Sequence, residues 1–454
     1  MKADLLVRGT IVTSDALVEG GWIAVQGGRI AAIGTGEALP AKETFDAGVS
    51  LVMPGVVDGQ THAGSYGGLK GIASTTRSAV AGGITTIVDM PYDNPAPLSD
   101  QATLQAKVEA IGQHAHANVA LYATIMPNQS TADVQALIEA GVVAFKISAF
   151  ESSSTRFPRI PADRVLDLLE ALSGTDIPLG IHNEDQEIVR ARIARARANG
   201  RDGIEAHSES RPPAAELGST AHFLELGAAT GAHAHIVHLT TARGFQLVEN
   251  YRNDGYRATG ELCVHYLWFD PATHGPELGA RMKVNPPIRP GQIELLWDEV
   301  SAGRVAFVSS DHSSWPIDNK FTSSIFEAGA GVPGLETLLP AFFTGAEKRG
   351  LDAVRLTARQ LSENPARFFG IWPMKGALMP GSDADIVILS RETTLWDSKT
   401  AHDELNWSPF DGREFSVKPV RTYVNGKLAW DGTSIANAPG DGRYVPRGPS
   451  GWTF

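Results

Sequence analysis

The sequence predicts an α/β protein: a TIM-like (β/α)8 barrel joined to a small β-sandwich domain that is built from both chain ends. Short apolar runs alternate with longer amphipathic stretches over roughly 300 residues, which is typical of parallel strands joined by helices. Glycine-punctuated β patterns flank this region on both sides. With 454 residues, 43% of them hydrophobic, the chain is long enough to bury a barrel core and a second, smaller core.

The first part of the small domain is predicted in residues 1–50. Its apolar runs are only a few residues long and glycines separate them, as in short strands connected by turns. The predicted strands are residues 5–7, 11–12, 22–25 and 29–33.

The barrel is predicted in residues 51–372. Each apolar run there is followed by a longer amphipathic stretch that fits a helix. The predicted strands are residues 52–57, 85–90, 119–125, 142–147, 178–181, 235–239 and 305–308.

The β pattern returns in residues 373–432. Asn425-Gly426 lies between two alternating runs, which predicts a hairpin with a type I′ turn. Neither terminal β segment is long enough to bury its own face, so we infer that the two ends pair into one domain with the barrel inserted between them. Residues 433–454 are rich in glycine and proline and are predicted to form an irregular extension.

Composition excludes several classes of partner. The 39 Lys and Arg against 51 Asp and Glu give a formal net charge of −12, which would repel nucleic acid. No run approaches the about 18 consecutive apolar residues of a membrane span. The single cysteine, Cys263, cannot form an intramolecular disulfide, and the amino terminus does not resemble a secretory signal. We therefore expect a cytoplasmic protein.

Polar residues stand where the apolar runs of the barrel stop, and the carboxyl ends of barrel strands meet at one mouth. Imidazole and carboxylate groups there could bind a catalytic divalent ion. A lysine cannot coordinate as an ammonium, but a neutral amine that has bound CO2 is a carboxylate-like ligand. The candidate ligands are His62, Lys146, His182, His238 and Asp311, and Gln60 stands at the same strand end as His62.

Each candidate also has a simpler interpretation. A single histidine at a strand end is more often a hydrogen-bonded core residue, and Asp311 could cap the segment that follows it. Their recurrence at the same place in successive βα units favours a shared metal site.

Nine motifs follow one another along nearly the whole chain. They are residues 54–62 (PGVVDGQTH), 145–146, 181–184 (IHNE), 235–240 (HIVHLT), 261–267 (ELCVHYL), 285–289 (NPPIR), 310–313 (SDHS), 331–336 (GVPGLE) and 375–386. In this order they resemble the cyclic amidohydrolase branch of the amidohydrolase superfamily, which includes hydantoinase, dihydropyrimidinase, allantoinase and dihydroorotase.

The resemblance implies a hydrolase that opens the ring of a cyclic amide, imide or ureide. It implies two metal ions bridged by carboxylated Lys146, with His182 and His238 on the second ion. Asp311 would bind the first ion and act as the general base, passing the proton of the attacking metal-activated hydroxide to the leaving nitrogen. Zinc is the first choice of metal, and manganese, cobalt and iron accept the same donors. A homotetramer or homodimer is also implied.

The chain departs from the family pattern in the first strand, where Gln60 and His62 stand in place of two histidines. An amide oxygen is a weaker donor to zinc than an imidazole. Either the site binds one ion, through Lys146, His182 and His238, or Gln60 or water completes a weaker first site. Of these two we favour the single ion.

Two further departures concern the substrate. The family's arginine after the first histidine pair is absent, which disfavours dihydroorotate, and the family's tyrosine shortly after the carboxylated lysine is replaced. Main-chain groups near Asn285 and Pro333 could still hold a ring amide, and His265 could contact substrate or a ligand. The candidates for the missing oxyanion donor are Ser148, Tyr66 and Trp315.

Two alternatives to a cyclic amidohydrolase remain at this stage. One is a non-catalytic assembly protein related to dihydropyrimidinase, which loss of a metal ligand would suit. The other is a mononuclear amidohydrolase that acts on a non-cyclic amide. The presence of Lys146, His182, His238 and Asp311 favours the cyclic amidohydrolase.

Overall fold

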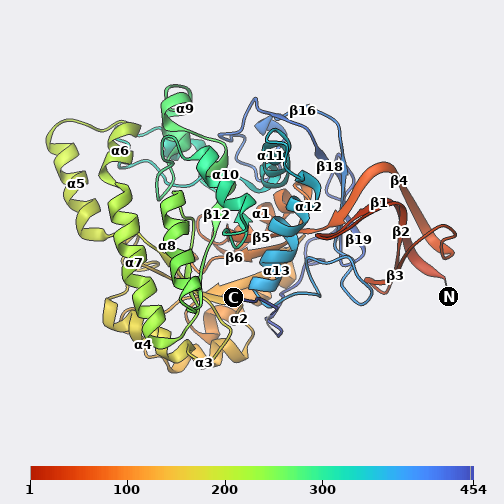
Figure 1. Cartoon of the computed structure of the whole chain (residues 1–454), viewed down its shortest axis with the longest axis horizontal. Coiled ribbons are helices and arrows are strands. Elements are labelled where there is room, and N and C mark those ends of the chain that lie inside the picture. The colour runs from red at the N-terminus through yellow and green to blue at the C-terminus, as the bar shows by residue number, and fades with distance from the viewer. Residues whose placement is uncertain (1, 450) are drawn as a thin grey trace.

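The computed structural model describes residues 2–449 and 451–454. Within these residues the main sheets have eight and seven strands, and Figure 1 shows the helices gathered around the first of them. The helices are α1 (Gly71–Ala81), α2 (Gln101–His114), α3 (Ala132–Glu139), α4 (Ala162–Leu172), α5 (Gln186–Ala198), α6 (Ile204–Ser210), α7 (Pro213–Thr230), α8 (Ala242–Asn253), α9 (Pro271–Leu278), α10 (Ile293–Ser301), α11 (Leu335–Glu347), α12 (Ala353–Ala358) and α13 (Asn364–Phe368).

The eight-stranded sheet is parallel throughout and closes into the predicted barrel. Its last strands are interrupted, so closure runs through the short β12–β13 pair and then through β14, which pairs with β5. The eight strands are β5 (Val56–His62), β6 (Ile84–Asp89), β7 (Asn118–Ala123), β8 (Ala144–Ser148), β9 (Leu179–His182), β10 (Ala234–Ile236), β11 (Ala258–Gly260) and β14 (His312–Ser313), and the separate pair is β12 (Leu262–Cys263) and β13 (Val308–Ser309).

Two strand predictions were wrong in detail. β11 and β12 were missed, because Gly260 and Glu261 interrupt the apolar pattern between them. The predicted strand at residues 52–57 is divided at Gly55, and its first half belongs to β4 of the other sheet. A side chain at position 55 would collide with Thr85, whose atoms lie 2.3 Å from an ideal Cβ.

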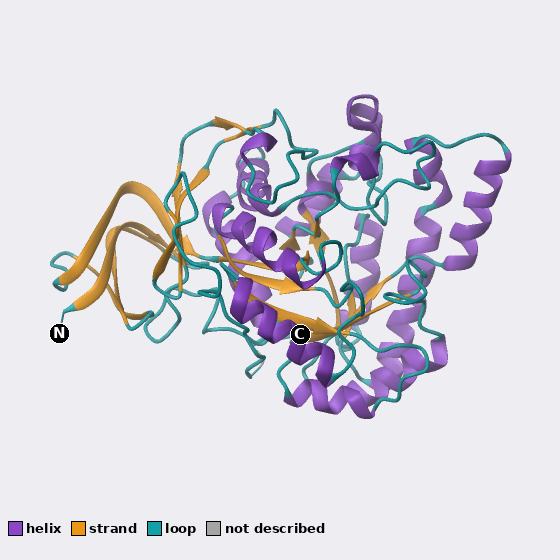
Figure 2. Cartoon of the chain, turned by 180° about the vertical axis from the view of Figure 1, so that it is seen from behind, coloured by secondary structure: helices purple, strands orange, loops and turns teal. Residues whose placement is uncertain are grey.

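The seven-stranded sheet combines both chain ends and lies at one end of the molecule, beside the barrel (Figure 2). Leu51–Pro54 pair antiparallel with Ile386–Leu389. The strands, in chain order, are β1 (Ala3–Val12), β2 (Leu17–Gln26), β3 (Arg29–Thr35), β4 (Ala41–Pro54), β15 (Ile386–Ser390), β18 (Lys418–Val424) and β19 (Lys427–Trp430), with a separate pair β16 (Thr394–Leu395) and β17 (Glu414–Phe415).

The predicted hairpin turn is confirmed between β18 and β19. Asn425 and Gly426 have φ angles of 51° and 77°, and a type I′ turn needs positive φ at both positions. After β19, residues 433–449 run as coil along the barrel, where Tyr444 bridges to Val119 of β7 and Arg447 Nη1 donates to the carbonyl of Val143 at 2.9 Å. The domain boundaries themselves stay predictions.

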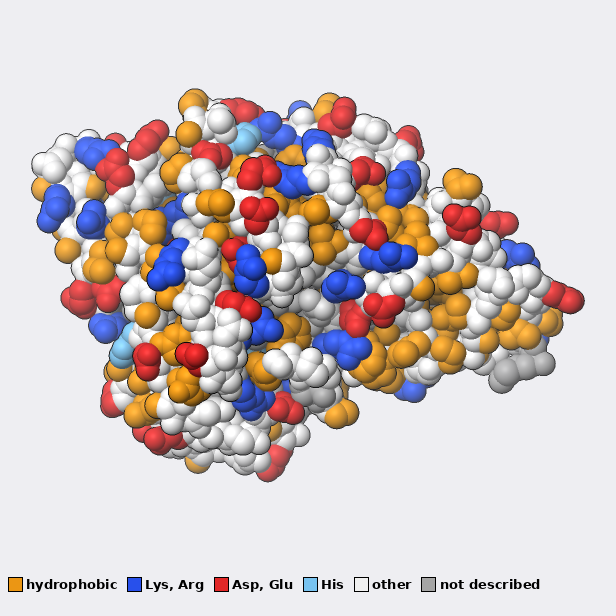
Figure 3. Space-filling model, in the orientation of Figure 1, with side chains coloured by type: hydrophobic (Ala, Val, Ile, Leu, Met, Phe, Trp, Pro, Cys, Tyr) orange, Lys and Arg blue, Asp and Glu red, His pale blue; other side chains and the backbone are white. Residues whose placement is uncertain are grey.

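The surface of the barrel carries both charge signs. Lysine and arginine side chains lie among aspartates and glutamates on the face drawn in Figure 3, with no single-sign field. No helix in the described part of the chain is long and apolar enough to cross a membrane.

Candidate active site at the carboxyl end of the barrel

The structure brings the predicted metal ligands to one mouth of the barrel, because each lies at the carboxyl end of a parallel strand. They come from five strand ends: Gln60 and His62 in β5, Lys146 in β8, His182 at the end of β9, His238 after β10, and Asp311 between β13 and β14.

Two of these residues have unusual backbone conformations. His238 and Asp311 adopt positive φ angles of 44° and 48°, which non-glycine residues seldom do. Such strain persists only where surrounding structure imposes it, and it is concentrated at functional sites.

His182 and His238 point ring nitrogens at each other. His182 Nδ1 lies 3.1 Å from His238 Nε2, and the other nitrogen of His182 lies 2.8 Å from the carboxylate of Glu184. Burial lowers the pKa of His238 well below its ordinary value, so this ring is neutral. Two imidazoles that converge in this way are suited to share one divalent ion.

Lys146 is buried and its side chain lies over Phe157, 5.7 Å from the ring centroid. No carboxylate in residues 2–449 or 451–454 comes within ion-pair distance of its amine. Burial lowers the pKa of Lys146, which favours the neutral amine that reacts with CO2.

Asp311 is held by two nitrogen atoms from β5. Gln60 Nε2 donates to Asp311 Oδ1 at 2.8 Å, and His62 Nε2 lies 3.3 Å from the same oxygen. Burial raises the pKa of Asp311, but the His62 hydrogen bond and charge outweigh it and hold this pKa far below its usual range. The carboxylate is therefore ionised and oriented.

Asp58 lies in β5, the strand that also carries Gln60 and His62, and it supports Asp311 through the neighbouring residue Ser310. The amide of Ser310 donates to Asp58 Oδ1 at 2.9 Å, and the Ser310 hydroxyl bonds the other oxygen. Burial raises the pKa of Asp58 to about 6. The position of Asp58 within the 54–62 motif is the only sequence signal for this role.

A cavity of about 530 Å³ is lined by Ala63, the residue that follows His62 in the chain. Tyr66 and Trp315 line it, with ring centroids 4.2 Å apart, as does Arg156. Arg156 Nη1 donates to the carbonyl of Ser65 at 2.7 Å. Sequence reasoning missed Arg156. This residue lies in the loop after β8, and only the fold brings it next to Ser65, in a segment after the first-strand motif that has no cation of its own.

The remaining predicted substrate contacts lie around the same mouth. Ser148 donates its hydroxyl to the carbonyl of Phe150, and Trp315 Nε1 donates to Ala330 at 2.7 Å. His265 is fully buried with both ring nitrogens unpaired among the described residues. Pro333 is buried, and Asn285 is half-buried and precedes a cis peptide bond to Pro286. Their contact with substrate stays a prediction.

The donors at the mouth fit a metal ion only if Lys146 takes part. Across the described residues, no group of three or more His, Cys, Asp and Glu side chains is arranged to hold a metal. The nitrogens of His182 and His238 converge, however, and Gln60 Oε1 is buried without a protein partner in the described structure. A carbamate on Lys146 would supply the anionic ligand that this set otherwise misses.

The chain is similar to known proteins over nearly its whole length. The chain matches the model of the amidohydrolase family over residues 51–429. It is 36% identical over 452 residues to an allantoinase of Rubrobacter xylanophilus, with 97% of each chain covered. It is 30% identical over 457 residues to an L-hydantoinase of Paenarthrobacter aurescens, with 98% of each covered.

Solved structures show the same similarity. The L-hydantoinase (dihydropyrimidinase) from Arthrobacter aurescens superposes with a TM-score of 0.93 at 29% identity, over 98% of this chain and 100% of that one. A D-hydantoinase superposes with a TM-score of 0.89 at 25% identity, over 98% of each chain. These neighbours confirm the predicted fold class.

Proposed function

The chain belongs to the amidohydrolase family, in its cyclic amidohydrolase branch, and from this premise we propose that it opens the ring of a cyclic ureide such as allantoin or hydantoin by metal-assisted hydrolysis. It is a hydrolase that acts on the C–N bonds of cyclic amides. The observation that carries the mechanism is the convergence of His182 and His238 beside Lys146, with an ionised Asp311 at the same mouth.

Lys146, His182 and His238 are the residues that would hold the ion, with Lys146 as a carbamate. Zinc is the first choice, and manganese, cobalt and iron suit the same donors. When bound, the ion polarises the ring carbonyl and lowers the pKa of water.

Asp311 is the general base. Its ionised carboxylate accepts the proton of the attacking water and passes it to the ring nitrogen as the C–N bond breaks. Water thereby adds across that bond, and a ring-opened carbamoyl or amide acid leaves. His62 and Gln60 hold this carboxylate in place through its Oδ1 atom.

The oxyanion donor that best fits the structure is Tyr66. Ser148 and Trp315 already donate to backbone carbonyls, whereas Tyr66 lines the cavity and its hydroxyl interacts with the side chain of Ser313. Burial raises the pKa of Tyr66, so the phenol keeps the proton that a donor needs.

In this proposal Gln60 positions the general base, Asp311, and does not bind the metal. Its amide nitrogen is committed to Asp311 at 2.8 Å, so the mouth has three strong ligands for one ion and a weaker set for a second. We therefore propose a mononuclear centre.

Metal analysis combined with hydrolysis assays tests the proposal. The full chain, purified without chelator, is expected to carry about one ion and to hydrolyse allantoin, hydantoin or dihydrouracil. No turnover of any of these after addition of zinc, manganese, cobalt or iron with bicarbonate would contradict it.

A further inference from the structure

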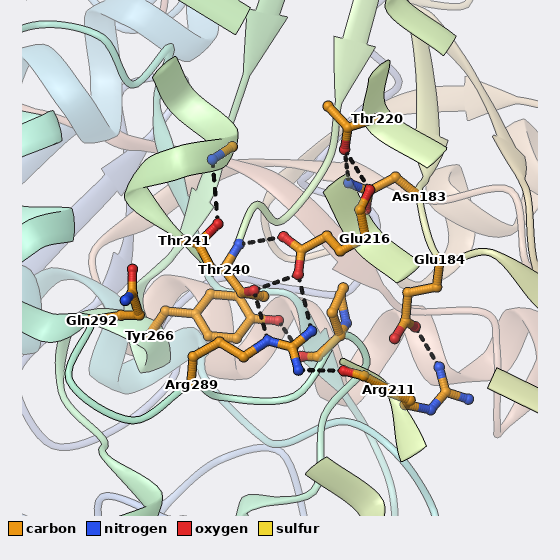
Figure 4. A network of polar contacts seen from close by, with 12 residues as sticks. Asn183, Glu184, Arg211, Glu216, Thr220, Thr240, Thr241, Tyr266, Arg289 and Gln292 are labelled. Carbon is orange, nitrogen blue, oxygen red and sulfur yellow. Dashed lines mark hydrogen bonds and ion pairs between the residues drawn. The ribbon is translucent and has the colours of Figure 1, made fainter. Parts of the chain in front are cut away.

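Two buried Glu–Arg pairs lie side by side next to the barrel mouth (Figure 4). Glu184 follows β9 and pairs with Arg211, and Glu216 of α7 pairs with Arg289 at 3.1 Å. All four side chains are at least 94% buried. Arg289 also donates to the backbone carbonyl of Arg211, so the two pairs form one network.

Burying two ion pairs is costly, because each charge loses its water. Replacing such pairs with apolar side chains is often neutral or stabilising, so a buried pair is weak evidence for a role in stability alone. A role in positioning is the better-supported explanation where the pair touches a functional group.

Glu184 touches such a group. Its Oε2 lies 2.8 Å from His182 Nε2, and the pairing with Arg211 keeps it a carboxylate, which only accepts hydrogen bonds. His182 must therefore donate from Nε2, and as a metal ligand, which has to be a neutral imidazole, it would keep its lone pair on Nδ1, the atom 3.1 Å from His238 Nε2.

We propose that Glu184, held by Arg211, is the positioning residue that sets the affinity of the barrel mouth for its divalent ion, by fixing the tautomer and orientation of His182. The inference rests on the proposed function, in which His182 is a ligand. Carboxylates behind ligand histidines raise ligand basicity, and their loss typically lowers metal affinity 10–100-fold.

The other pair, Glu216 and Arg289, holds the backbone at Thr240 and does not contact the ring of a proposed ligand. Glu216 accepts from the amide of Thr240 at 2.9 Å and from its hydroxyl, two residues after His238. The ring of His238 has no comparable carboxylate, since its Nδ1 is unpartnered within the described chain. Glu216 is therefore a matched control: equally buried, paired with arginine, and out of contact with a proposed ligand.

The test compares Glu184→Gln with Glu216→Gln in the full chain. Each protein is stripped with chelator and titrated with zinc and cobalt in bicarbonate buffer, in competition with a chromophoric chelator. Glu184→Gln is expected to bind both ions about 10–100-fold more weakly than the wild type, and Glu216→Gln within about threefold of it. Thermal unfolding of the metal-free proteins shows whether the two variants are equally folded.

Glu184→Asp covers the case in which the glutamine variant does not fold. It keeps a charge for Arg211 but withdraws the carboxylate from His182, so the same loss of affinity is expected. Wild-type affinity in either Glu184 variant, or an equal loss in Glu216→Gln, would overturn the proposal. A wild type that binds no metal would overturn it together with the proposed function, whereas metal binding without ureide hydrolysis contradicts the proposed function alone.

Discussion

The two sides of the barrel mouth are built in opposite ways. On one side, His182 and His238 direct ring nitrogens at each other across 3.1 Å. On the other, Gln60 and His62 direct nitrogens at an anion, Asp311, at 2.8 and 3.3 Å. The first arrangement attracts a cation and the second balances a negative charge, so one side suits metal binding and the other suits proton transfer.

Lys146→Ala is the strongest test of this division. Without the anionic carbamate, we expect the chain to lose its metal and its turnover to fall by about 10³-fold or more, as measured by elemental analysis and ureide hydrolysis. The control is Lys70→Ala, an exposed lysine at the end of the short helix Gly68–Lys70 near the cavity. Full metal content in Lys146→Ala would contradict the carbamate ligand.

Asp311→Asn separates the two sides. The amide cannot accept the proton, so we expect kcat to fall by about 10²–10⁴-fold while metal content stays at the wild-type level. Loss of the ion in this variant would show that Asp311 is a ligand and that the two sides are not independent.

Gln60→His should convert the base side into a second metal site. An imidazole in place of the amide restores a strong donor beside His62, so we expect the ratio of metal to chain to rise from about one to about two. An unchanged ratio in elemental analysis would show that more than this imidazole is missing.

The smallest expected effect is on the pH dependence of stability in the metal-free protein. Burial alone would raise the pKa of Glu184, but Arg211 and His182 outweigh this effect and lower the pKa to about 2. Its stabilising contribution is therefore present above its ordinary value of 4.5 and is lost as pH falls toward 2. Burial raises the pKa of Asp58 to about 6, so its contribution is present below 3.8 and is lost as pH rises to 6.

Urea unfolding between pH 3 and 7 measures both slopes. Glu184→Gln should flatten the acid-side loss of stability, and Asp58→Asn should flatten the loss between pH 4 and 6. Identical pH profiles for the wild type and both variants would show that these carboxylates titrate alike in the folded and unfolded chains.

The features of the fold and of the site that the sequence predicts are those with a signal within a few consecutive residues. A polar residue after an apolar run marked each strand end, which was sufficient to bring Lys146, His182 and Asp311 to one mouth. The turn at Asn425-Gly426 was predictable because only such residues accept positive φ at both positions easily.

The missed parts depend on contacts between distant segments. Arg156 reaches Ser65 from the loop after β8, and Arg211 reaches Glu184 from the end of α6. Neither contact has a periodic pattern in the sequence, because the hydrogen bond from Arg156 to the Ser65 carbonyl and the salt bridge between Arg211 and Glu184 each form only when distant segments meet in space. The strand pattern at residues 258–263 failed for a local reason, since Glu261 is a fully buried carboxyl inside the barrel wall.

The sheet that unites both chain ends also has a consequence for biosynthesis. β4 is complete early in translation, but its partner β15 lies near the end of the chain. At a translation rate of about 5–20 residues per second, one edge of β4 would stay unpaired for on the order of tens of seconds before β15 is synthesised. During this interval the nascent chain exposes an unpaired strand edge, which is a site for non-native pairing, so we expect chaperone demand to be greatest just before the last strands leave the ribosome.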